Sequence, residues 1–267
     1  MSNIVLSQIY IYPVKSTRGI SLNSSVVSDR GLQYDRRWML IDAEDKFITA
    51  RTFPKLVLVN SQISGEVLRL SAPGMRELSV PLSGVFKYGC SVQIWKDQCT
   101  AHYCGKEAER WFSRYLSIPV RLVYMPQESQ RLVDRNYSDG GRIVSFADGY
   151  PFLLISEASL ADLNRRLKTP LEMERFRPNL VIKGCRAYEE DCWKAIRIAD
   201  ILFLVAKPCS RCVITTIDPS QGTTSREPLR TLATYRASQG KVFFGQNLIH
   251  DKEGSIAVDM PVEVIRD

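Results

Sequence analysis

The residues of this chain that could do chemistry most directly are two cysteines, Cys209 and Cys212, separated by Ser210 and Arg211. Cysteines at this CxxC spacing can form half of a zinc site, a redox-active dithiol, one functional thiolate, or two small buried side chains. The spacing alone does not choose among these uses. The residues around the pair therefore have to be weighed.

Two of these uses fit the surrounding sequence poorly. A structural zinc site needs four ligands, and the chain has no second CxxC and only two histidines, His102 and His250. A redox dithiol of the thioredoxin type normally opens a helix, whereas Cys212 leads into residues 213–217, which favour a strand. Zinc binding and disulfide exchange are both disfavoured.

A single functional thiolate fits the sequence better. Lys207 and Arg211 flank the pair, and nearby cations lower the pKa of a thiol and favour its metal-binding form. A thiolate is a soft ligand that suits a transition metal. On these residues alone, a metal-binding thiolate and two inert buried cysteines both remain open.

The elements that must position this pair follow from the pattern on either side. Residues 201–207 form an apolar run typical of a strand, and residues 212–217 form a second one. We therefore expect a loop at residues 208–211 that is held rigidly at both ends, with Cys212 where the next strand begins.

The first 125 residues consist mainly of short β-rich runs separated by turn residues, a spacing typical of a barrel or sandwich. The predicted strands cover residues 4–14, 24–28, 37–42, 46–50, 56–60, 67–72, 78–82, 91–95 and 120–125. One helix interrupts them after Cys104, where apolar residues from Ala108 to Leu116 recur at helical spacing.

Residues 126–150 are polar and irregular, so we place a domain boundary near residue 125 and expect domains at 1–125 and 126–267. Beyond it, Ser156 can cap a helix whose apolar face carries Leu160, Leu163 and Leu167. The remaining predicted elements are a helical piece at 173–177, a strand at 179–184, a helix at 228–235, a strand at 242–249 and two short final strands.

Composition bounds the class of protein. The 267 residues are 45% hydrophobic and 24% charged, which is typical of a globular protein. No apolar run approaches the ~20 residues that span a bilayer, and no basic region precedes the apolar N-terminal stretch, so we expect no membrane span or signal peptide. An odd count of seven cysteines favours reduced thiols and a cytoplasmic location.

The formal net charge of +7 favours an anionic partner, such as a phosphate-bearing cofactor, a nucleotide or nucleic acid. A basic but solvated surface explains the charge equally well. Nucleic acid is the least favoured partner, because aromatic residues do not alternate with Lys and Arg on any predicted strand.

The sequence as a whole is similar to a known family, through motifs that follow one another over nearly the whole chain. These are Tyr12-Pro13-Val14-Lys15-Ser16, Gly31-Leu32, Asp35-Arg36-Arg37-Trp38, Thr49-Ala50-Arg51, Pro151-Phe152, Ser156-Glu157-Ala158-Ser159-Leu160, Phe176-Arg177-Pro178-Asn179, Pro208-Cys209-Ser210-Arg211-Cys212, Thr215-Thr216-Ile217-Asp218-Pro219, Gly222, Glu227-Pro228-Leu229, Thr231-Leu232 and Tyr235-Arg236. Together they resemble the MOSC-domain molybdenum proteins, in particular the mitochondrial amidoxime-reducing component and its bacterial YcbX-like relatives.

The resemblance implies a mixed, β-rich (α+β) fold, with an N-terminal MOSC β-barrel-like domain followed by a MOSC β-barrel domain that has a few helices. It also implies a molybdenum cofactor, Mo-molybdopterin, whose metal is held by the ene-dithiolate of the pterin and one protein cysteine. Cys212 matches that metal ligand. Cys209 is then left as a neighbour that either packs or lies near the cofactor, and we favour packing.

The resemblance also assigns residues to the cofactor. Lys15, Ser16 and Arg36 match family positions that bind it, and charge-assisted donors of this kind suit its phosphate. The other residues expected to bind or line the cofactor are Thr49, Arg51, Arg177, Asn179, Ser210, Arg211 and Asn247. An isolated arginine would more commonly be a solvated surface cation, but several polar motifs in family order favour binding.

Two further positions bear on catalysis and substrate. Asp148 matches an acidic residue near the metal in the family, where a carboxylate could relay a proton to the oxygen that leaves the substrate. An Asp before Gly149 equally suits a turn. Asn247 occupies a position that the mitochondrial members fill with an aromatic residue, and this departure bears on substrate preference.

The activity implied by the resemblance is a molybdenum-dependent, two-electron, two-proton removal of oxygen from N-hydroxylated compounds. The substrate class includes hydroxylamines, amidoximes and N-hydroxylated bases such as 6-hydroxylaminopurine. Bacterial relatives often continue into a ferredoxin-like domain, and this chain has no plant-type cysteine spacing. Either it is a shortened version or, as we expect, a separate protein donates the electrons. The alternative function is a sulfur or molybdenum cofactor carrier that uses the Cys212 thiolate.

Overall fold

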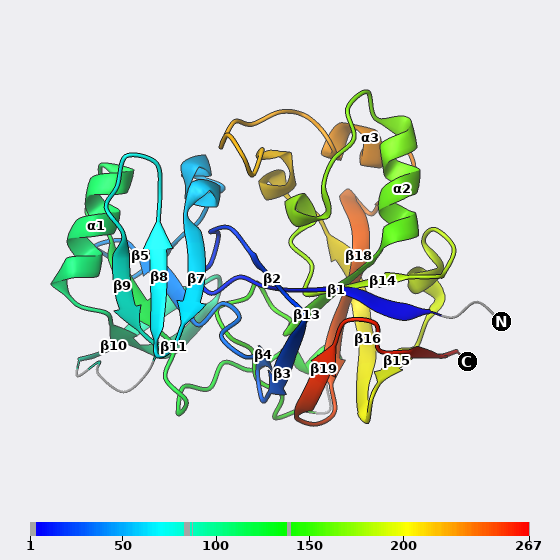
Figure 1. The fold of residues 1–267 in the computed structure, drawn as a ribbon, viewed down its shortest axis with the longest axis horizontal. Helices are drawn as coiled ribbons and strands as arrows, with labels where there is room; N and C mark the ends of the chain where they lie inside the picture. The colour runs from blue at the N-terminus through cyan, green and yellow to red at the C-terminus, as the bar shows by residue number, and fades with distance from the viewer. Residues whose placement is uncertain (1–3, 83–85, 87, 138–139, 267) are drawn as a thin grey trace.

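The computed structural model describes residues 4–82, 86, 88–137 and 140–266. It is a mixed, β-rich fold with two groups of sheets side by side. In Figure 1 one group contains β5 and β7 to β11 with helix α1 on its outer side, and the other contains β13 to β16 and β18 with helices α2 and α3. None of the helices in the described part of the chain is long and apolar enough to cross a membrane.

The first group contains a five-stranded sheet and a three-stranded sheet. The five-stranded sheet has the order β10 (Gly89–Ile94), β11 (Asp97–Tyr103), β12 (Arg121–Tyr124), β5 (Trp38–Ile41) and β6 (Phe47–Ile48). The three-stranded sheet contains β7 (Asn60–Ser64), β8 (Val67–Ser71) and β9 (Leu78–Pro81). Helix α1 (Lys106–Leu116) buries Trp111 and Phe112 in a core that includes side chains of both sheets.

The second group is built on a nine-stranded sheet. Its order is β2 (Ile20–Leu22), β1 (Val5–Ile11), β14 (Leu180–Lys183), β13 (Phe152–Ser156), β18 (Lys241–His250), β16 (Ile201–Ser210), β15 (Ala195–Ile198) and β20 (Val262–Ile265), with β17 (Ala237–Ser238) paired to β18. A three-stranded sheet contains β19 (Gly254–Ala257), β3 (Ser24–Ser28) and β4 (Gly31–Leu32). Strands β1 and β2 come from the start of the chain, so sheet membership crosses residue 125. A domain boundary there stays a prediction.

Helix α2 (Glu157–Arg166) begins where the sequence predicts. The Ser156 hydroxyl accepts a hydrogen bond from the Ser159 backbone N–H at 3.0 Å, and Leu163 is buried. Beneath this cap, the buried carboxylate of Glu190 accepts hydrogen bonds from the Ser156 hydroxyl at 3.0 Å and the Ser159 hydroxyl at 2.7 Å. The cap therefore also satisfies a buried acidic group.

Helix α3 (Leu229–Ala233) and five short 3-10 helices complete the described elements. The 3-10 helices are η1 (Pro54–Leu58), η2 (Arg135–Tyr137), η3 (Met173–Phe176), η4 (Glu189–Cys192) and η5 (Val213–Thr216). The expected helical piece near residue 173 is confirmed as η3.

Three local predictions are wrong. Residues 56–60 do not form one strand, because a 3-10 turn that starts at Pro54 runs to Leu58 and β7 begins only at Asn60. Residues 212–217 are not a strand, because the backbone turns into η5 directly after Cys212. The expected loop at 208–211 is mostly strand, since β16 continues to Ser210 opposite β18.

The extension of β16 through Pro208 has a physical reason. The register between β16 and β18 shifts between Val205 and Lys207 and again between Pro208 and Ser210. Proline is tolerated in a strand at such irregularities, because no ladder hydrogen bond from its nitrogen is required there. The strand thus reaches almost to Cys212.

Candidate functional site

A cavity of about 130 Å³ is lined by segments from both ends of the chain. All of the residues predicted to act at the site except Thr49 line it. They are Lys15, Ser16, Arg36, Arg51, Asp148, Arg177, Asn179, Ser210, Arg211, Cys212 and Asn247. The fold therefore brings together motifs that are far apart in the sequence.

Cys212 is held at the junction of β16 and η5. The Arg211 backbone N–H donates to the Val242 carbonyl of β18 at 2.7 Å, which ties the end of β16 to its neighbour. The Cys212 carbonyl accepts from both the backbone N–H and the hydroxyl of Thr215, at 3.1 and 3.0 Å. These hydrogen bonds fix the backbone at Cys212, whose side chain is half-buried.

Cys209 also lines the cavity, which agrees with the alternative to packing that the sequence left open. It is partly buried against the apolar cluster of Phe176, Phe244 and Leu232. The Arg211 guanidinium nevertheless donates from Nη1 to the Cys209 sulfur at 3.1 Å. Packing thus describes only part of the surroundings of Cys209, because one cavity cation lies directly against its thiol.

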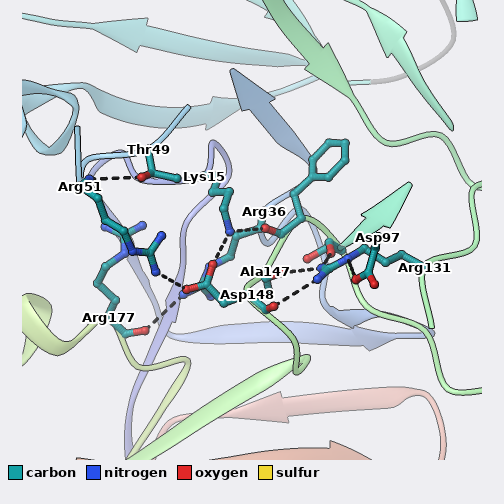
Figure 2. Close-up of polar contacts among 11 residues, drawn as sticks. Lys15, Arg36, Thr49, Arg51, Asp97, Arg131, Ala147, Asp148 and Arg177 are labelled. Atoms are coloured by element: carbon teal, nitrogen blue, oxygen red, sulfur yellow. Dashed lines mark hydrogen bonds and ion pairs between the residues drawn. The ribbon is translucent and has the colours of Figure 1, made fainter. Parts of the chain in front are cut away.

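One charged part of the wall is a pair of cations on one carboxylate (Figure 2). Lys15 Nζ lies 2.6 Å from Asp148 Oδ1 and donates to the Phe146 carbonyl at 2.7 Å. Arg51 Nη2 lies 2.9 Å from Asp148 Oδ2. Asp148 therefore pairs with both cations, and one of them, Arg51, also interacts electrostatically with Cys212.

This arrangement shifts the protonation equilibria of its members. Desolvation would raise the pKa of Asp148, but Lys15 and Arg51 outweigh it and hold that pKa well below the usual range of a carboxyl group. Burial is the main cause that lowers the pKa of Lys15 from 10.5 to about 8, against the opposing effect of Asp148. Burial would lower the pKa of Arg51, but Asp148 and Cys212 raise it. At neutral pH Asp148 is a carboxylate, and Lys15 is the side chain whose proton is most easily released.

The loop that carries Asp148 is fixed by Arg131, which the sequence analysis did not single out. Its buried guanidinium donates to the carbonyls of Ser145, Ala147 and Asp148, and it pairs with Asp97 at 2.9 Å (Figure 2). No local pattern distinguishes this arginine from the others of residues 126–150. Only the folded loop shows that its donors converge on the backbone beside Asp148.

Tyr12 forms the base of the other charged part of the wall. The Arg36 and Arg177 guanidinium carbons lie 4.2 and 4.1 Å from the centre of its ring, distances typical of cation–π contacts. The buried Asp35 carboxylate pairs with Arg36 at 2.6 Å. Burial lowers the pKa of Arg177 to about 10, so Arg177 stays charged at neutral pH.

Three of the predicted cofactor residues have left-handed backbone conformations. The φ angles are 74° at Ser16, 49° at Arg36 and 58° at Arg177. Residues other than glycine rarely adopt this conformation, and such strained positions concentrate at ligand sites and active sites. Their convergence on one cavity supports a binding role for that cavity.

Several predicted binding groups already have protein partners. Arg36 donates from Nη1 to Asp35 and Asn179 and from Nη2 to the Arg177 carbonyl. The Asn179 amide bonds to Arg36 and to backbone groups of Tyr10 and Leu153. These side chains line the cavity but also hold its walls together.

Two predicted residues lie in supporting positions. Thr49 does not line the cavity, and its hydroxyl accepts from the Arg51 backbone N–H at 3.2 Å, so it positions Arg51. Asn247 does line the cavity, and its side chain donates to the Lys207 carbonyl at 3.4 Å.

Two arginines of the cavity, Arg51 and Arg211, each have a buried N–H donor without a partner among the described residues. These donors are Nη1 of Arg51 and Nε of Arg211. A buried unpaired N–H is costly, and both side chains line the cavity with Cys212. The donor set therefore suits an anionic group that is rich in hydrogen-bond acceptors.

Comparison with known proteins decides the family. Residues 3–119 match the MOSC N-terminal beta barrel domain, and residues 141–263 match the MOSC domain. The chain belongs to the MOSC-domain family. Lys15, Arg36 and Arg51 of the site come from the MOSC N-terminal domain, whereas Asp148 and Cys212 come from the MOSC domain.

Individual relatives agree with this assignment. The chain is 37% identical to mitochondrial amidoxime reducing component 2 of Rattus norvegicus over 279 residues, which cover 96% of this chain and 82% of the relative. It is 36% identical to mitochondrial amidoxime-reducing component 1 of Homo sapiens over 284 residues, which cover 97% of this chain and 82% of the relative. The MOSC domain is associated with binding of the molybdenum cofactor.

Proposed function

We propose that this MOSC-domain protein binds a molybdenum cofactor in the cavity at Cys212 and reduces N-hydroxylated compounds. The observation that carries the proposal is the cavity itself, where one half-buried thiol faces Arg51 and two cations have unpaired buried donors. The names of the relatives as amidoxime-reducing components support the reductase class.

The residues present fit a molybdopterin. Its terminal phosphate is an anion, and charge-assisted hydrogen bonds from Arg36 and Arg177 suit such a group. The Nε of Arg211 offers a further donor that has no partner among the described residues. Cys212 supplies a soft thiolate, which suits molybdenum better than a hydroxyl or carboxylate would. When bound, the cofactor supplies the two-electron redox chemistry of the reduction.

The protein groups orient the substrate and handle protons. Loss of the N–OH oxygen as water consumes two electrons and two protons. Lys15 holds a proton at Nζ, 2.6 Å from Asp148 Oδ1, and a pKa of about 8 makes this proton available near neutral pH. Asp148 stays ionised beside it and Arg51. In this account Lys15 donates the proton that we first assigned to Asp148, and Asp148 holds the ammonium in place.

The electron supply and location are part of the proposal. We infer that a separate protein donates the electrons, and the names of the relatives as amidoxime-reducing components support this. All seven cysteines are free thiols, which fits the cytoplasmic location expected from the sequence. The relatives named above are mitochondrial by name.

The experiment that tests the proposal is turnover of a hydroxylamine by the purified, cofactor-loaded protein with an artificial electron donor. We expect stoichiometric formation of the amine. A sulfur or molybdenum cofactor carrier, the second candidate, would instead pass on sulfur or cofactor and leave the hydroxylamine unchanged. Loaded protein that reduces no N-hydroxylated compound would rule out the reductase.

A further inference from the structure

A groove of about 1100 Å³ continues from the cavity at Cys212. The two share wall residues, including Arg51, Asp148, Tyr150 and Cys212. Beyond the shared part, the wall of the groove includes the aromatic side chains of Phe47 and Trp95. A substrate that places its N–OH group in the small cavity would leave the rest of its body in this aromatic groove.

Trp95 has an unusual place in the fold. Ile94 of β10 pairs with Asp97 of β11, so Trp95 begins a two-residue turn between these strands. Its φ is 54°, a left-handed conformation that such turns normally give to Gly, Asn or Asp. An indole brings no advantage to the turn, and 43% of Trp95 is exposed. A strained position of this kind points to a functional use of the side chain.

The indole is also held in one position next to the reacting end. The Arg51 guanidinium lies 4.8 Å from its ring, and the same Arg51 pairs with Asp148 at 2.9 Å. The Phe47 ring meets the indole edge-on, with centroids 4.9 Å apart. A fixed aromatic surface loses little conformational entropy when a second ring stacks on it.

The groove suits a flat, rigid group on the substrate. Tyr150 adds an aromatic ring to the wall, and Lys207 Nζ lies 5.0 Å from the centre of that ring. Ring-on-ring contacts in offset or edge-on geometry strengthen binding beyond the burial of apolar area. An alkyl chain in the same groove would gain only the burial of its apolar area.

From these contacts we propose that Trp95 is a specificity-determining residue. It favours N-hydroxylated compounds in which a planar aromatic ring is attached to the nitrogen of the N–OH group or to the carbon bonded to that nitrogen. Compounds with a small alkyl group at the same position are disfavoured. The inference rests on the proposed reductase function and names the substrate class of the same site. Trp95 acts by stacking on the ring of the substrate and takes no part in the chemistry.

The test compares an aryl with an alkyl substrate. The kcat/KM values for benzamidoxime and acetamidoxime are measured with cofactor-loaded protein and an artificial donor. In Trp95→Ala the ratio of the two values should fall about tenfold, the scale of one lost aromatic pair. Trp95→Phe should retain most of the ratio, because a ring remains. Tyr88→Ala serves as the matched control, since Tyr88 is an aromatic residue that is 74% exposed and does not line the groove. It should leave the ratio unchanged.

A binding measurement separates this inference from the reductase proposal. The O-methyl ether of benzamidoxime lacks the N–OH group, and its Kd can be measured by calorimetry without turnover. We expect about tenfold weaker binding to Trp95→Ala than to the wild type. If the wild-type protein reduces neither amidoxime, the reductase proposal fails and this Kd alone decides the role of Trp95. An unchanged Kd, or equal losses of kcat/KM for both substrates, would overturn it.

Discussion

Single residues of the cavity differ in how far their donors are already used. Arg36 has protein partners on both terminal nitrogens, one of them the buried Asp35. Removing it would leave a buried carboxylate without its cation, so an Arg36 variant would lose stability as well as any ligand. Arg51 and Arg211 each keep one buried donor unpaired. These two arginines are therefore better probes of what the cavity binds.

Arg51→Gln is expected to weaken cofactor retention about tenfold or more. The substitution removes a charge-assisted donor, which is typically worth about 1.5–3 kcal/mol. Molybdenum per chain is measured after dilution and desalting. Arg69→Gln is the control, because Arg69 is an exposed arginine that pairs with Glu77 and does not line the cavity. Equal retention by the two variants would remove Arg51 from the binding account.

The two cysteines should differ in their roles. Cys212→Ser replaces a soft thiolate with a hard hydroxyl, so reduction of a hydroxylamine should be abolished. Cys209→Ser loses mainly an apolar contact and its contact with Arg211, so substantial activity should remain. Turnover is normalised to cofactor content, so that lost binding is not mistaken for lost chemistry. Complete inactivation by both variants would indicate that the cysteines act as a pair.

Lys15 gives a prediction for pH. Its pKa is about 8 in the folded protein against an ordinary value of 10.5, so the folded state binds this proton less tightly than the unfolded chain. The folded state is therefore penalised below pH 8, and the penalty disappears as the pH rises from about 8 to about 10.5. The free energy of unfolding of the cofactor-free wild type should rise, relative to Lys15→Met, by up to roughly 3 kcal/mol over this range. Denaturant titrations at pH 7 and pH 10 measure it, and a flat difference would contradict the assignment.

At the scale of elements, the Ser156 hydroxyl both caps helix α2 and donates a hydrogen bond to the buried carboxylate of Glu190. Ser156→Ala removes the acceptor for the Ser159 N–H and a donor to the buried Glu190. Loss of an N-cap costs about 0.5–2 kcal/mol, and the lost hydrogen bond to the Glu190 carboxylate adds to this cost. We expect a total near 2 kcal/mol in urea unfolding. Ser24→Ala, at an exposed position of β3, should change the stability by less than about 0.5 kcal/mol. A similar small effect for Ser156→Ala would show that the cap is dispensable.

The elements near the site also show where the sequence is informative. The β-rich pattern, the helix after Cys104 and the helix capped by Ser156 are confirmed, because each has strong periodicity or a capping residue. The strand predicted at residues 212–217 is wrong. β-branched residues also fit a 3-10 turn, and here the hydrogen bonds of Thr215 to the Cys212 carbonyl hold that turn. Strand β11 was missed, although buried Cys99 and Ala101 alternate with exposed Gln98 and Thr100. That period of two was the available signal.

At the scale of the whole molecule, the cavity depends on contacts between distant segments. Lys15 reaches Asp148 across 133 positions, and Arg177 reaches the Thr17 carbonyl across 160. The family motifs could identify the residues that line the cavity, because each motif is a short run of residues that is visible in the sequence. They could not show which donors remain free or that Arg131 fixes the Asp148 loop, because both depend on backbone groups that meet only in the folded chain.

The measurement that tests the central claim most directly is the metal content of the purified chain. Protein expressed in a host that makes molybdopterin is desalted and analysed for molybdenum and zinc. The account predicts about one molybdenum per chain, because one thiolate and a cationic cavity with unpaired donors define a single cofactor site. Stoichiometric zinc without molybdenum, from the same cofactor-competent host, would contradict it.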